Sequence, residues 1–440
     1  MIPEYAKTVA ETLCRAGFEA YFVGGCVRDL CMGAEPHDWD VATSAVPEEM
    51  HRVFAAFRTL DTGIRHGTVT VLSDGVPVEV TTYRVDGSYS DHRHPDRVTF
   101  TRSLEDDLSR RDFTVNAMAM SPEGEIVDLF GGQRDLKNGV IRCVGDPDTR
   151  FREDSLRILR GMRFASVLRF AVEADTASAM GRCRELMRDV SAERVRAELT
   201  KMLCGSGVRE VLLRYTEELG VVLPEILPAV GFRQHHFRHM SDVWGHTCEV
   251  VRQIRPEPCF RWAALLHDLG KPACLKVGED GLDHFRGHAQ ESLRLAKEVT
   301  ERLRFDSQSR RRILFLVENH DRRVPAEAAA AKRALAKYGY GDLMDLIEVF
   351  RADLLGQSPE FHRELANYER LAEMIRALEE QKECVTLRQL QVNGHDLVAR
   401  GLTGPKVGEG LTMLLDAVIE GKCANERGAL LAYLKEKGVL

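Results

Sequence analysis

The segment that most constrains this chain is FVGGCVRDLCMGAEPHDWD at residues 22–40. It predicts a short apolar strand, a turn at Gly24 and Gly25, and a second strand beside two aspartates. Side chains of a strand alternate between its two faces, so Asp38 and Asp40 are expected on the same face. Mg²⁺ prefers oxygen ligands and usually takes one or two protein carboxylates, with water and substrate phosphates completing its shell. The pattern therefore predicts a metal-dependent site for phosphoryl or nucleotidyl transfer.

Length and composition bound the class of protein. A chain of 440 residues is long enough for two or more domains. No apolar run approaches the length needed to cross a bilayer, and the acid-containing helical pattern of residues 1–20 is unlike a signal peptide. The 11 cysteines are scattered without a C-x-x-C pair, which favours buried thiols over a disulfide or zinc framework. These features predict a cytoplasmic protein with no membrane partner.

The charge is unevenly distributed along the chain. Residues 150–201 carry 12 lysines and arginines against 8 acidic residues, whereas the whole chain has a formal net charge of −7. A basic segment in an acidic host indicates where a polyanion would be held. Taken alone, a solvated helical face is the better explanation of this segment.

Two regimes of secondary structure are expected. Residues 1–145 alternate helical and strand-like patterns, and Ser73-Asp74-Gly75 between two β-rich runs predicts a hairpin. After residues 145–147 the pattern is helical almost to the C-terminus. The sequence therefore predicts an α/β head followed by a helical remainder.

Two stretches of the head carry residues suited to binding a nucleoside triphosphate. Gly24 and Gly25 let the backbone approach a phosphate closely, and Arg28 can reach the same triphosphate. The run DLSRRDFTVNA at residues 107–117 is expected at the start of a helix and carries four polar candidates for triphosphate and ribose binding: Arg110, Arg111, Asp112 and Asn116. A helix-terminal ion-pair network is the structural alternative.

Two further features of the head adjoin the predicted site. Glu79 lies among valines of a strand, where a charge requires a partner or a metal ion. It is either a third metal-site carboxylate or the partner of an arginine such as Arg84, and we favour a supporting role. Residues 84–102 are polar and contain Gly, Ser and Pro, so they are predicted to form a mobile loop beside the active site.

Residues 151–164, FREDSLRILRGMRF, are expected to form a helix that selects the base. Asp154 and Arg157 are three residues apart and are therefore predicted to be neighbours on that helix. A carboxylate beside a guanidinium matches the amino donor and ring-nitrogen acceptor of cytosine or adenine, and it opposes the edges of guanine and uracil. The sequence thus predicts selection of CTP and ATP. The alternative is a surface ion pair worth only a few tenths of a kcal/mol.

Taken together, these motifs resemble a known family. GGCVRDL, HDWDVAT, EVTTYR, RRDFTVNAMAM, DLFGGQRDL and REDSLRILRGMRFA occur in the order of the class II transfer-RNA nucleotidyltransferases, the CCA-adding enzymes, and their relatives the bacterial poly(A) polymerases. The helix pattern SAERVRAEL at residues 191–199 resembles a family motif that supports the template helix. The C-terminal stretches at residues 390–411 and 421–434 are similar to the tail of the CCA-adding branch.

The resemblance implies roles for the candidate residues. Asp38 and Asp40 would be the catalytic residues and would hold Mg²⁺. Asp154 and Arg157 would act as a protein template, with Glu153 positioning them. Arg160 and Arg163 are similar to the triphosphate ligands of the family.

A second set of candidate metal ligands begins in the run WGHTCEV. LLHDLGKPA, FRGHAQES, VENHDRR and FRADLLGQ supply further histidines and aspartates, and their order resembles that of the HD-domain phosphohydrolases. The resemblance implies four core ligands, and two more histidines would extend the set to a second metal ion. The core ligands are His246, His267, Asp268 and Asp353; the additional ones are His288 and His320. Histidine and aspartate suit a transition metal such as Ni²⁺ or Mn²⁺.

The implied architecture is multidomain α+β. A polymerase beta-like nucleotidyltransferase head at residues 1–145 would precede a helical neck with the template at 146–228, a helical HD-like body at 229–356 and a helical, tRNA-binding tail at 357–440. The implied reaction is template-independent addition of CCA to the 3′ end of transfer RNA from CTP and ATP, with a possible second hydrolytic activity in the HD region.

Four alternatives to this activity stay open. One is a poly(A) polymerase, and another is an enzyme that adds only CC or only A; the polar loop at 84–102 disfavours the CC-only form. A third is a protein whose main activity is HD-type hydrolysis. The alternative from a different class is a non-catalytic RNA-binding or nucleotide-sensing module.

Overall fold

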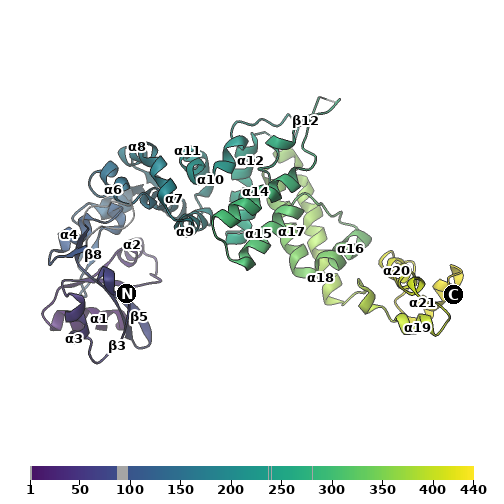
Figure 1. Cartoon of the computed structure of the whole chain (residues 1–440), viewed down its shortest axis with the longest axis horizontal. Helices are drawn as coiled ribbons and strands as arrows, with labels where there is room; N and C mark the ends of the chain where they lie inside the picture. Colours follow the sequence, from purple (N-terminus) through teal and green to yellow (C-terminus); the bar gives the residue numbers. More distant parts are fainter. Residues whose placement is uncertain (1, 87–97, 236, 239, 280) are drawn as a thin grey trace. The chain divides into compact units, whose positions relative to one another are not determined.

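The computed structural model describes residues 2–86, 98–235, 237–238, 240–279 and 281–440. The chain divides into two compact units (Figure 1). Unit 1 comprises Met1–Leu227 with Arg302–Arg304, and unit 2 comprises Pro228–Glu301 with Phe305–Leu440. Most of the predicted loop at 84–102 lies outside the described residues, between β6 (Arg84–Asp86) and β7 (Val98–Phe100).

The head is built on a seven-stranded mixed sheet with the strand order β3-β4-β5-β2-β1-β8-β9. Within it β2 and β5 run parallel, and the other neighbouring strands run antiparallel. The strands are β1 (Ala20–Val23), β2 (Asp40–Thr43), β3 (Arg58–Gly63), β4 (Thr68–Ser73), β5 (Val76–Thr82), β8 (Ala119–Met120) and β9 (Ile126–Val127). The helical segments of the head are α1 (Glu4–Arg15), α2 (Gly25–Cys31), α3 (Pro47–Val53), η1 (Ile64–His66), α4 (Leu104–Ser109), η2 (Thr114–Asn116) and α5 (Gly132–Asn138).

The predicted hairpin is confirmed between β4 and β5. Ser73 pairs with Val76, so the connection has two residues, and both Asp74 and Gly75 have positive φ (50° and 79°). Such turns match the right-handed twist of the strands. The hairpin places Glu79 on β5, beside β2.

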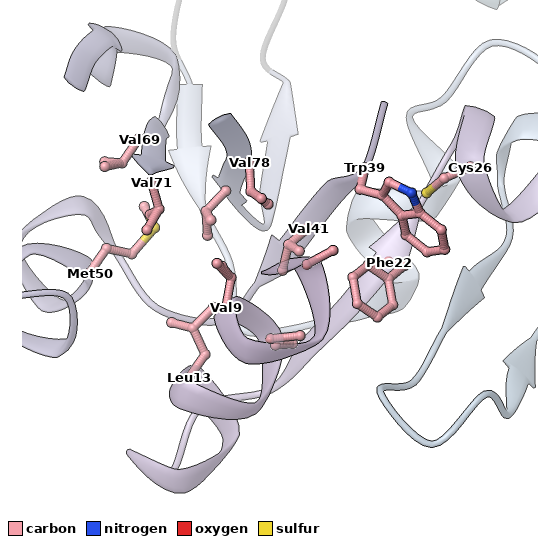
Figure 2. Close-up of a cluster of buried hydrophobic side chains, with 14 of the residues drawn as sticks. Val9, Leu13, Phe22, Cys26, Trp39, Val41, Met50, Val69, Val71 and Val78 are labelled. Carbon is pink, nitrogen blue, oxygen red and sulfur yellow. The ribbon is translucent and has the colours of Figure 1, made fainter. Parts of the chain in front are cut away.

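Apolar side chains from α1 and several strands form the core of the head (Figure 2). Trp39 is buried in this core and packs edge-on against Phe22, with 5.1 Å between the ring centroids. Because side chains alternate along an extended chain, anchoring Trp39 in the core turns the flanking aspartates away from it. The core thereby sets the orientation of the predicted metal site.

The remainder of unit 1 is mostly helical. Its helical segments are α6 (Pro147–Glu153), α7 (Leu156–Leu168), α8 (Ala174–Cys183), η3 (Arg184–Asp189), α9 (Ala192–Leu203), α10 (Val208–Arg214) and α11 (Thr216–Val222), with η4 (Pro224–Ala229) at its end. The helical neck contains one short strand, β11 (Ala171–Val172), which pairs in parallel with β10 (Val140–Ile141). These short strands join the head to the segment that follows α7.

Unit 2 is also mostly helical, with one short antiparallel pair, β12 (Lys276–Val277) and β13 (Asp283–His284). Its helical segments are α12 (Val243–Gln253), α13 (Pro258–Leu266), η5 (Pro272–Cys274), α14 (His288–Arg302), α15 (Ser307–Asn319), α16 (Ala328–Tyr338), α17 (Tyr340–Leu355), η6 (Pro359–Glu364), α18 (Leu365–Glu380), η7 (Leu387–Gln389), α19 (Gly394–Val398), α20 (Pro405–Ile419) and α21 (Arg427–Glu436). No helix in the described part of the chain has the length and apolar character required to span a membrane. A mixed-sheet head followed by a mostly helical chain agrees with the predicted fold class.

Candidate active site and metal centre

A cleft of about 990 Å³ in unit 1 gathers most of the predicted nucleotide and Mg²⁺ residues. Head and neck both contribute to its lining. The predicted residues that line it are Gly24, Gly25, Arg28, Asp38, Asp40, Arg110, Arg111, Asp112, Asn116, Asp154, Arg157, Arg160 and Arg163. Residues separated by more than one hundred positions in the sequence thus share one site.

Asp38 and Asp40 form the carboxylate end of the cleft, and Glu79 lies beside Asp40 on the neighbouring strand β5. Asp38 and Asp40 are exposed to the cleft, and Glu79 lies directly opposite Asp40 in the register between β2 and β5. Desolvation and the negative charges of Glu79 and Asp38 raise the pKa of Asp40 to about 6, although Arg111 opposes the shift. Crowded carboxylates with a raised pKa and oxygen-only donors are the environment expected of a Mg²⁺ site. Arg84, which the sequence suggested as a partner of Glu79, donates a hydrogen bond to the carbonyl oxygen of His66.

The turn between β1 and α2 brings backbone close to an arginine. Gly24 has a φ of 76°, and a Cβ added there would lie 3.3 Å from Nη1 of Arg111. Arg111 and Arg110 both form ion pairs with the buried carboxylate of Asp107, at 3.0 and 2.6 Å. The two arginines are therefore held in place while they line the cleft.

The prediction that residues 107–117 begin a helix is wrong. Helix α4 ends at Ser109, and the 3₁₀ turn η2 starts at Thr114, so Arg110 to Phe113 connect two short elements. The reason is that Ser103 caps α4 earlier, accepting a hydrogen bond from the backbone of Asp106. Four cleft residues therefore project from a connection and a short turn.

A hydrogen-bonded network links the head to α7. Arg28 donates to Oδ1 of Asn116 at 2.9 Å, and the amide of Asn116 donates to Asp112 at 3.3 Å. Asp112 also accepts two hydrogen bonds from Arg160, at 2.6 and 2.7 Å. Burial alone would raise the pKa of Asp112, but Arg160 lowers it, so the carboxyl is ionised. The network fixes the head against the neck within unit 1.

Three guanidinium groups surround the ring of Phe164 on α7. Arg163 lies 4.1 Å from the ring centroid, Arg28 lies at 5.4 Å and Arg160 at 5.5 Å. The aromatic face favours cations, and Glu198 of α9 forms an ion pair with Arg163 at 3.2 Å. The result is a concentrated positive region suited to a polyphosphate.

The prediction that Asp154 and Arg157 are neighbours on one continuous helix is wrong. Asp154 has an extended backbone between α6 and α7, and its Oδ1 accepts a hydrogen bond from the backbone N–H of Leu156. Its Oδ2 accepts from Arg194 at 2.7 Å. Arg157 is the first-turn residue that pairs with Glu153, at 2.7 Å, and it donates to the carbonyl of Arg110. This local bond from the aspartate side chain to the backbone two residues further on competes with continued helix formation.

Both residues nevertheless line the same cleft, and the pairing of Glu153 with Arg157 fits the positioning role predicted for Glu153. Several residues of the cleft and of its network were missed by sequence reasoning. They are Asp107, Phe164, Arg194, Glu198 and Lys201. The motif at 191–199 was a partial signal, because Arg194 and Glu198 both belong to it.

The second set of predicted ligands meets in unit 2. Histidines and aspartates from several helices form two overlapping groups, and in each the ligand atoms lie within 4.8 Å of one another. The first group is His246, His267, Asp268 and Asp353; the second is Asp268, His288 and His320. Asp268 is common to both, so its two oxygens can serve two metal ions.

The four imidazoles are oriented by the backbone. Each Nδ1 faces a carbonyl oxygen, at 3.0 Å for His246, 2.7 Å for His267, 2.8 Å for His288 and 2.7 Å for His320. Backbone carbonyls accept, so Nδ1 carries the proton and Nε2 is left to bind a metal ion. The Nε2 atoms lie 3.2 to 3.5 Å from an oxygen of Asp268.

The donor set fits a divalent transition metal. His267 Nε2 and Oδ1 of Asp268 are buried and have no hydrogen-bond partner within the described residues, as ligand atoms of a metal ion would be. Lys271 lies 2.6 Å from Asp268, and Arg323 pairs with Asp353. Burial alone would lower the pKa of His267, but Asp268 and Asp353 raise it to about 9. Sequence reasoning missed Lys271 and Arg323, although Lys271 follows Asp268 at helical i,i+3 spacing.

Two exposed aspartates at the start of a strand, facing a cleft lined with arginines, define the head as that of a nucleotidyltransferase. Four family models match successive parts of the chain. A model described as Poly A polymerase head domain matches residues 20–142, and one described as Probable RNA and SrmB-binding site of polymerase A matches residues 169–229. A model described as HD domain matches residues 236–388, and one described as tRNA nucleotidyltransferase domain 2 matches residues 349–434.

Full-length relatives give the same result. The CCA-adding enzyme of Lactobacillus helveticus (strain DPC 4571) is 34% identical over 435 residues, covering 98% of this chain and 96% of the relative. That of Geobacillus kaustophilus (strain HTA426) is 35% identical over 446 residues, covering 99% and 97%. The crystal structure of the Bacillus stearothermophilus CCA-adding enzyme in complex with CTP matches with a TM-score of 0.73 at 32% identity, covering 100% of this chain and 98% of that one. The chain belongs to the CCA-adding enzyme family, and both its nucleotidyltransferase and HD regions imply the use of divalent metal ions.

Proposed function

We propose that this chain adds CCA to the 3′ end of transfer RNA, using CTP and ATP and releasing pyrophosphate. The observation that carries the proposal is the shared cleft, in which the carboxylates of β2 face the arginines and the residues at the start of α7. The tail at 357–440 would bind the transfer RNA. All 11 cysteines are free thiols, as expected in a reducing compartment, so we place the enzyme in the cytoplasm.

In this proposal the terminal 3′-hydroxyl of the RNA attacks the α-phosphorus of the nucleotide. Asp38 and Asp40 would hold Mg²⁺, which when bound activates the hydroxyl and neutralises developing negative charge. Glu79 adds a third carboxylate opposite Asp40 and supports the site. Gly24 and Gly25 admit the phosphates to the backbone, and Arg28, Arg110, Arg111, Arg160 and Arg163 balance the charge of the triphosphate and of the leaving pyrophosphate.

Base selection would depend on Asp154 and Arg157. Each oxygen of Asp154 already accepts one hydrogen bond, but a carboxylate oxygen has a second lone pair that can accept from the amino group of cytosine or adenine. Arg157 would donate to the ring nitrogen next to that amino group. Arg194 and Glu153 hold the two groups in place, and Asp112 and Asn116 supply polar contacts for the ribose and phosphates.

The test is a nucleotide-addition assay with transfer RNA lacking its 3′ end, Mg²⁺, CTP and ATP, followed by sequencing of the products. We expect C, C and A to be added in that order and addition to stop. Asp38→Ala should abolish addition while its thermal unfolding stays close to wild type, because Asp38 is exposed. Unlimited addition of A from ATP alone would instead identify a poly(A) polymerase, and addition of only CC or only A would identify a partial enzyme. No addition to any acceptor would refute the proposal.

We also propose that the HD centre is a metal-dependent phosphohydrolase acting on nucleotide or RNA-end phosphates, with Ni²⁺ or Mn²⁺ as the metal. The observation that favours it is the convergence of four Nε2 atoms on the shared Asp268. Hydrolysis of p-nitrophenyl phosphate and of a 2′,3′-cyclic nucleotide should survive Asp38→Ala and disappear in Asp268→Ala. Equal loss in both variants, or no hydrolysis with either metal, would leave the centre a structural part of the transfer-RNA cradle.

A further inference from the structure

One wall of the active-site cleft has no part in the roles assigned above. It consists of Val167 and Leu168 at the end of α7, Lys201 on α9 and the residues Cys204 to Ser206 after α9; we call it the Lys201 wall. Val167 is 47% exposed, which is high for an apolar side chain lining a cleft. Lys201 and Ser206 are also exposed. The wall therefore offers an apolar surface beside a cation and a hydroxyl group.

The charge of Lys201 differs from that of the cleft arginines in one respect. Each cleft arginine forms an ion pair inside the protein: Arg28 with Asp29, Arg110 and Arg111 with Asp107, Arg157 with Glu153, Arg160 with Asp112, Arg163 with Glu198 and Arg194 with Asp154. Lys201 has no acidic partner within ion-pair distance among the described residues. Its positive charge is therefore available to an anion that enters the cleft.

The reaction requires two nucleic-acid substrates in one cleft. A volume of about 990 Å³ lies at the upper end of the range for sites that hold one small ligand, so there is room beside a nucleoside triphosphate. Proteins bind single-stranded nucleic acid by placing cations along the backbone and apolar or aromatic surfaces against the bases. Lys201 can donate to a polyphosphate, but Val167 and Leu168 cannot. A nucleotide within a strand can use both the cation, for its phosphate, and the apolar side chains, for its ribose or base.

We propose that the Lys201 wall is the subsite for the terminal nucleotides of the acceptor strand. Lys201 contacts a backbone phosphate, and Val167 and Leu168 contact the ribose or base that precedes the reactive 3′-hydroxyl. Ser206 supplies a hydroxyl group for hydrogen bonding to the strand. This assignment rests on the proposed nucleotide addition, because it places the second substrate of that reaction.

The test compares binding of an RNA minihelix that ends before CCA with kinetics for CTP, using the full chain. Lys201→Ala should weaken minihelix binding about two- to fivefold and reduce the salt slope of log Kd by about 0.7, with the KM for CTP unchanged. Lys201→Arg keeps the positive charge, so the Kd for the minihelix and its salt slope should stay close to those of wild type. Lys137→Ala removes the same charge from an exposed position of α5 outside the cleft lining and should leave minihelix binding unchanged.

A second variant tests the apolar part of the wall. Val167→Asp puts a negative charge on an exposed side chain, so folding should be retained while minihelix binding falls and CTP kinetics stay the same. A raised KM for CTP with unchanged minihelix binding would overturn the proposal and assign Lys201 to the triphosphate. Unchanged values in both variants would overturn it as well. Failure of wild type to add nucleotides to any acceptor is a separate result, because it refutes the proposed function itself.

Discussion

At the scale of single residues, base selection depends on how firmly Asp154 is held. Arg194 and the backbone of Leu156 each occupy one of its oxygens, so the carboxylate presents fixed lone pairs to the base. Asp154→Ala should reduce the ratio of kcat/KM for CTP over UTP by about 10- to 100-fold, since a hydrogen bond to a charged group contributes about 1.5–3 kcal/mol. Steady-state kinetics with all four nucleotides provide the measurement.

Arg163→Ala is the matched control for this prediction. Arg163 lies on α7, the helix that follows Asp154, but it contacts Phe164 and Glu198, so its loss should lower kcat/KM for the four nucleotides by a similar factor. Uniform losses in both variants would contradict the assignment of base selection to Asp154.

Protonation of His267 predicts how the HD centre responds to pH. Asp268 and Asp353 raise the pKa of His267 to about 9, so in the metal-free protein this imidazole is charged at pH 7.5. Protonated His267 therefore stabilises the folded state. This contribution is fully present below the pKa of an unfolded histidine, about 6.5, and it is lost as the pH rises through 9. Metal binding requires a neutral imidazole, so Mn²⁺ uptake at pH 7.5 should release about one proton and tighten with pH up to about 9.

Calorimetric titration with Mn²⁺ in buffers of different ionisation enthalpy measures this proton release directly. Asp38→Ala should retain this proton release, because it removes a carboxylate of the head site and leaves the ligands of the HD centre intact. A binding enthalpy that does not depend on the buffer would show that His267 is neutral before the metal ion binds.

At the scale of elements, the turn between β1 and α2 couples backbone conformation to the phosphate site. Gly24→Ala forces an alanine to a φ of 76° and places its Cβ 3.3 Å from Arg111, so Arg111 must move. Gly33→Ala, just after α2, has the same conformational penalty at φ 73° but meets no atom within 4 Å. Both variants should lose about 1–2 kcal/mol of unfolding free energy, but only Gly24→Ala should also lose nucleotide addition. Thermal unfolding and kcat/KM, measured in parallel, separate the two effects; equal activity in both variants would contradict the role of this turn.

The elements also show what could be predicted from the sequence. Alternation around Trp39 and the two-residue turn at Asp74-Gly75 are local, so the paired aspartates and the hairpin followed from the residues alone. The break between α6 and α7 did not, because Asp154 and Arg157 have helical spacing. The hydrogen bond from the backbone N–H of Leu156 to the side chain of Asp154 competes with a continuous helix. Arg194 and Glu198 were missed for another reason: only the fold brings them to Asp154 and Arg163. Asp107, in contrast, has i,i+3 and i,i+4 spacing to Arg110 and Arg111, so its pairing is local.

At the scale of the whole molecule, each of the two compact units carries one chemical site. The carboxylate and arginine cleft belongs to unit 1, and the histidine and aspartate centre belongs to unit 2. A ligand that binds only the folded form stabilises the unit that holds it, by about 2.7 kcal/mol when its concentration is 100 times the Kd. Calorimetric unfolding of the full chain should therefore show CTP with Mg²⁺ shifting one transition and Mn²⁺ alone shifting another.

Substitutions in the two sites assign these transitions. Asp268→Ala removes the oxygens that both ligand groups share, so it should abolish the Mn²⁺ shift and leave the CTP shift intact. Arg160→Ala removes the partner of Asp112 in the cleft, so it should abolish the CTP shift and leave the Mn²⁺ shift intact. A local loss of ligand affinity acts only on the folding equilibrium that includes that ligand. If either variant abolished both shifts, the two sites would therefore be energetically coupled, and the two units would not unfold independently.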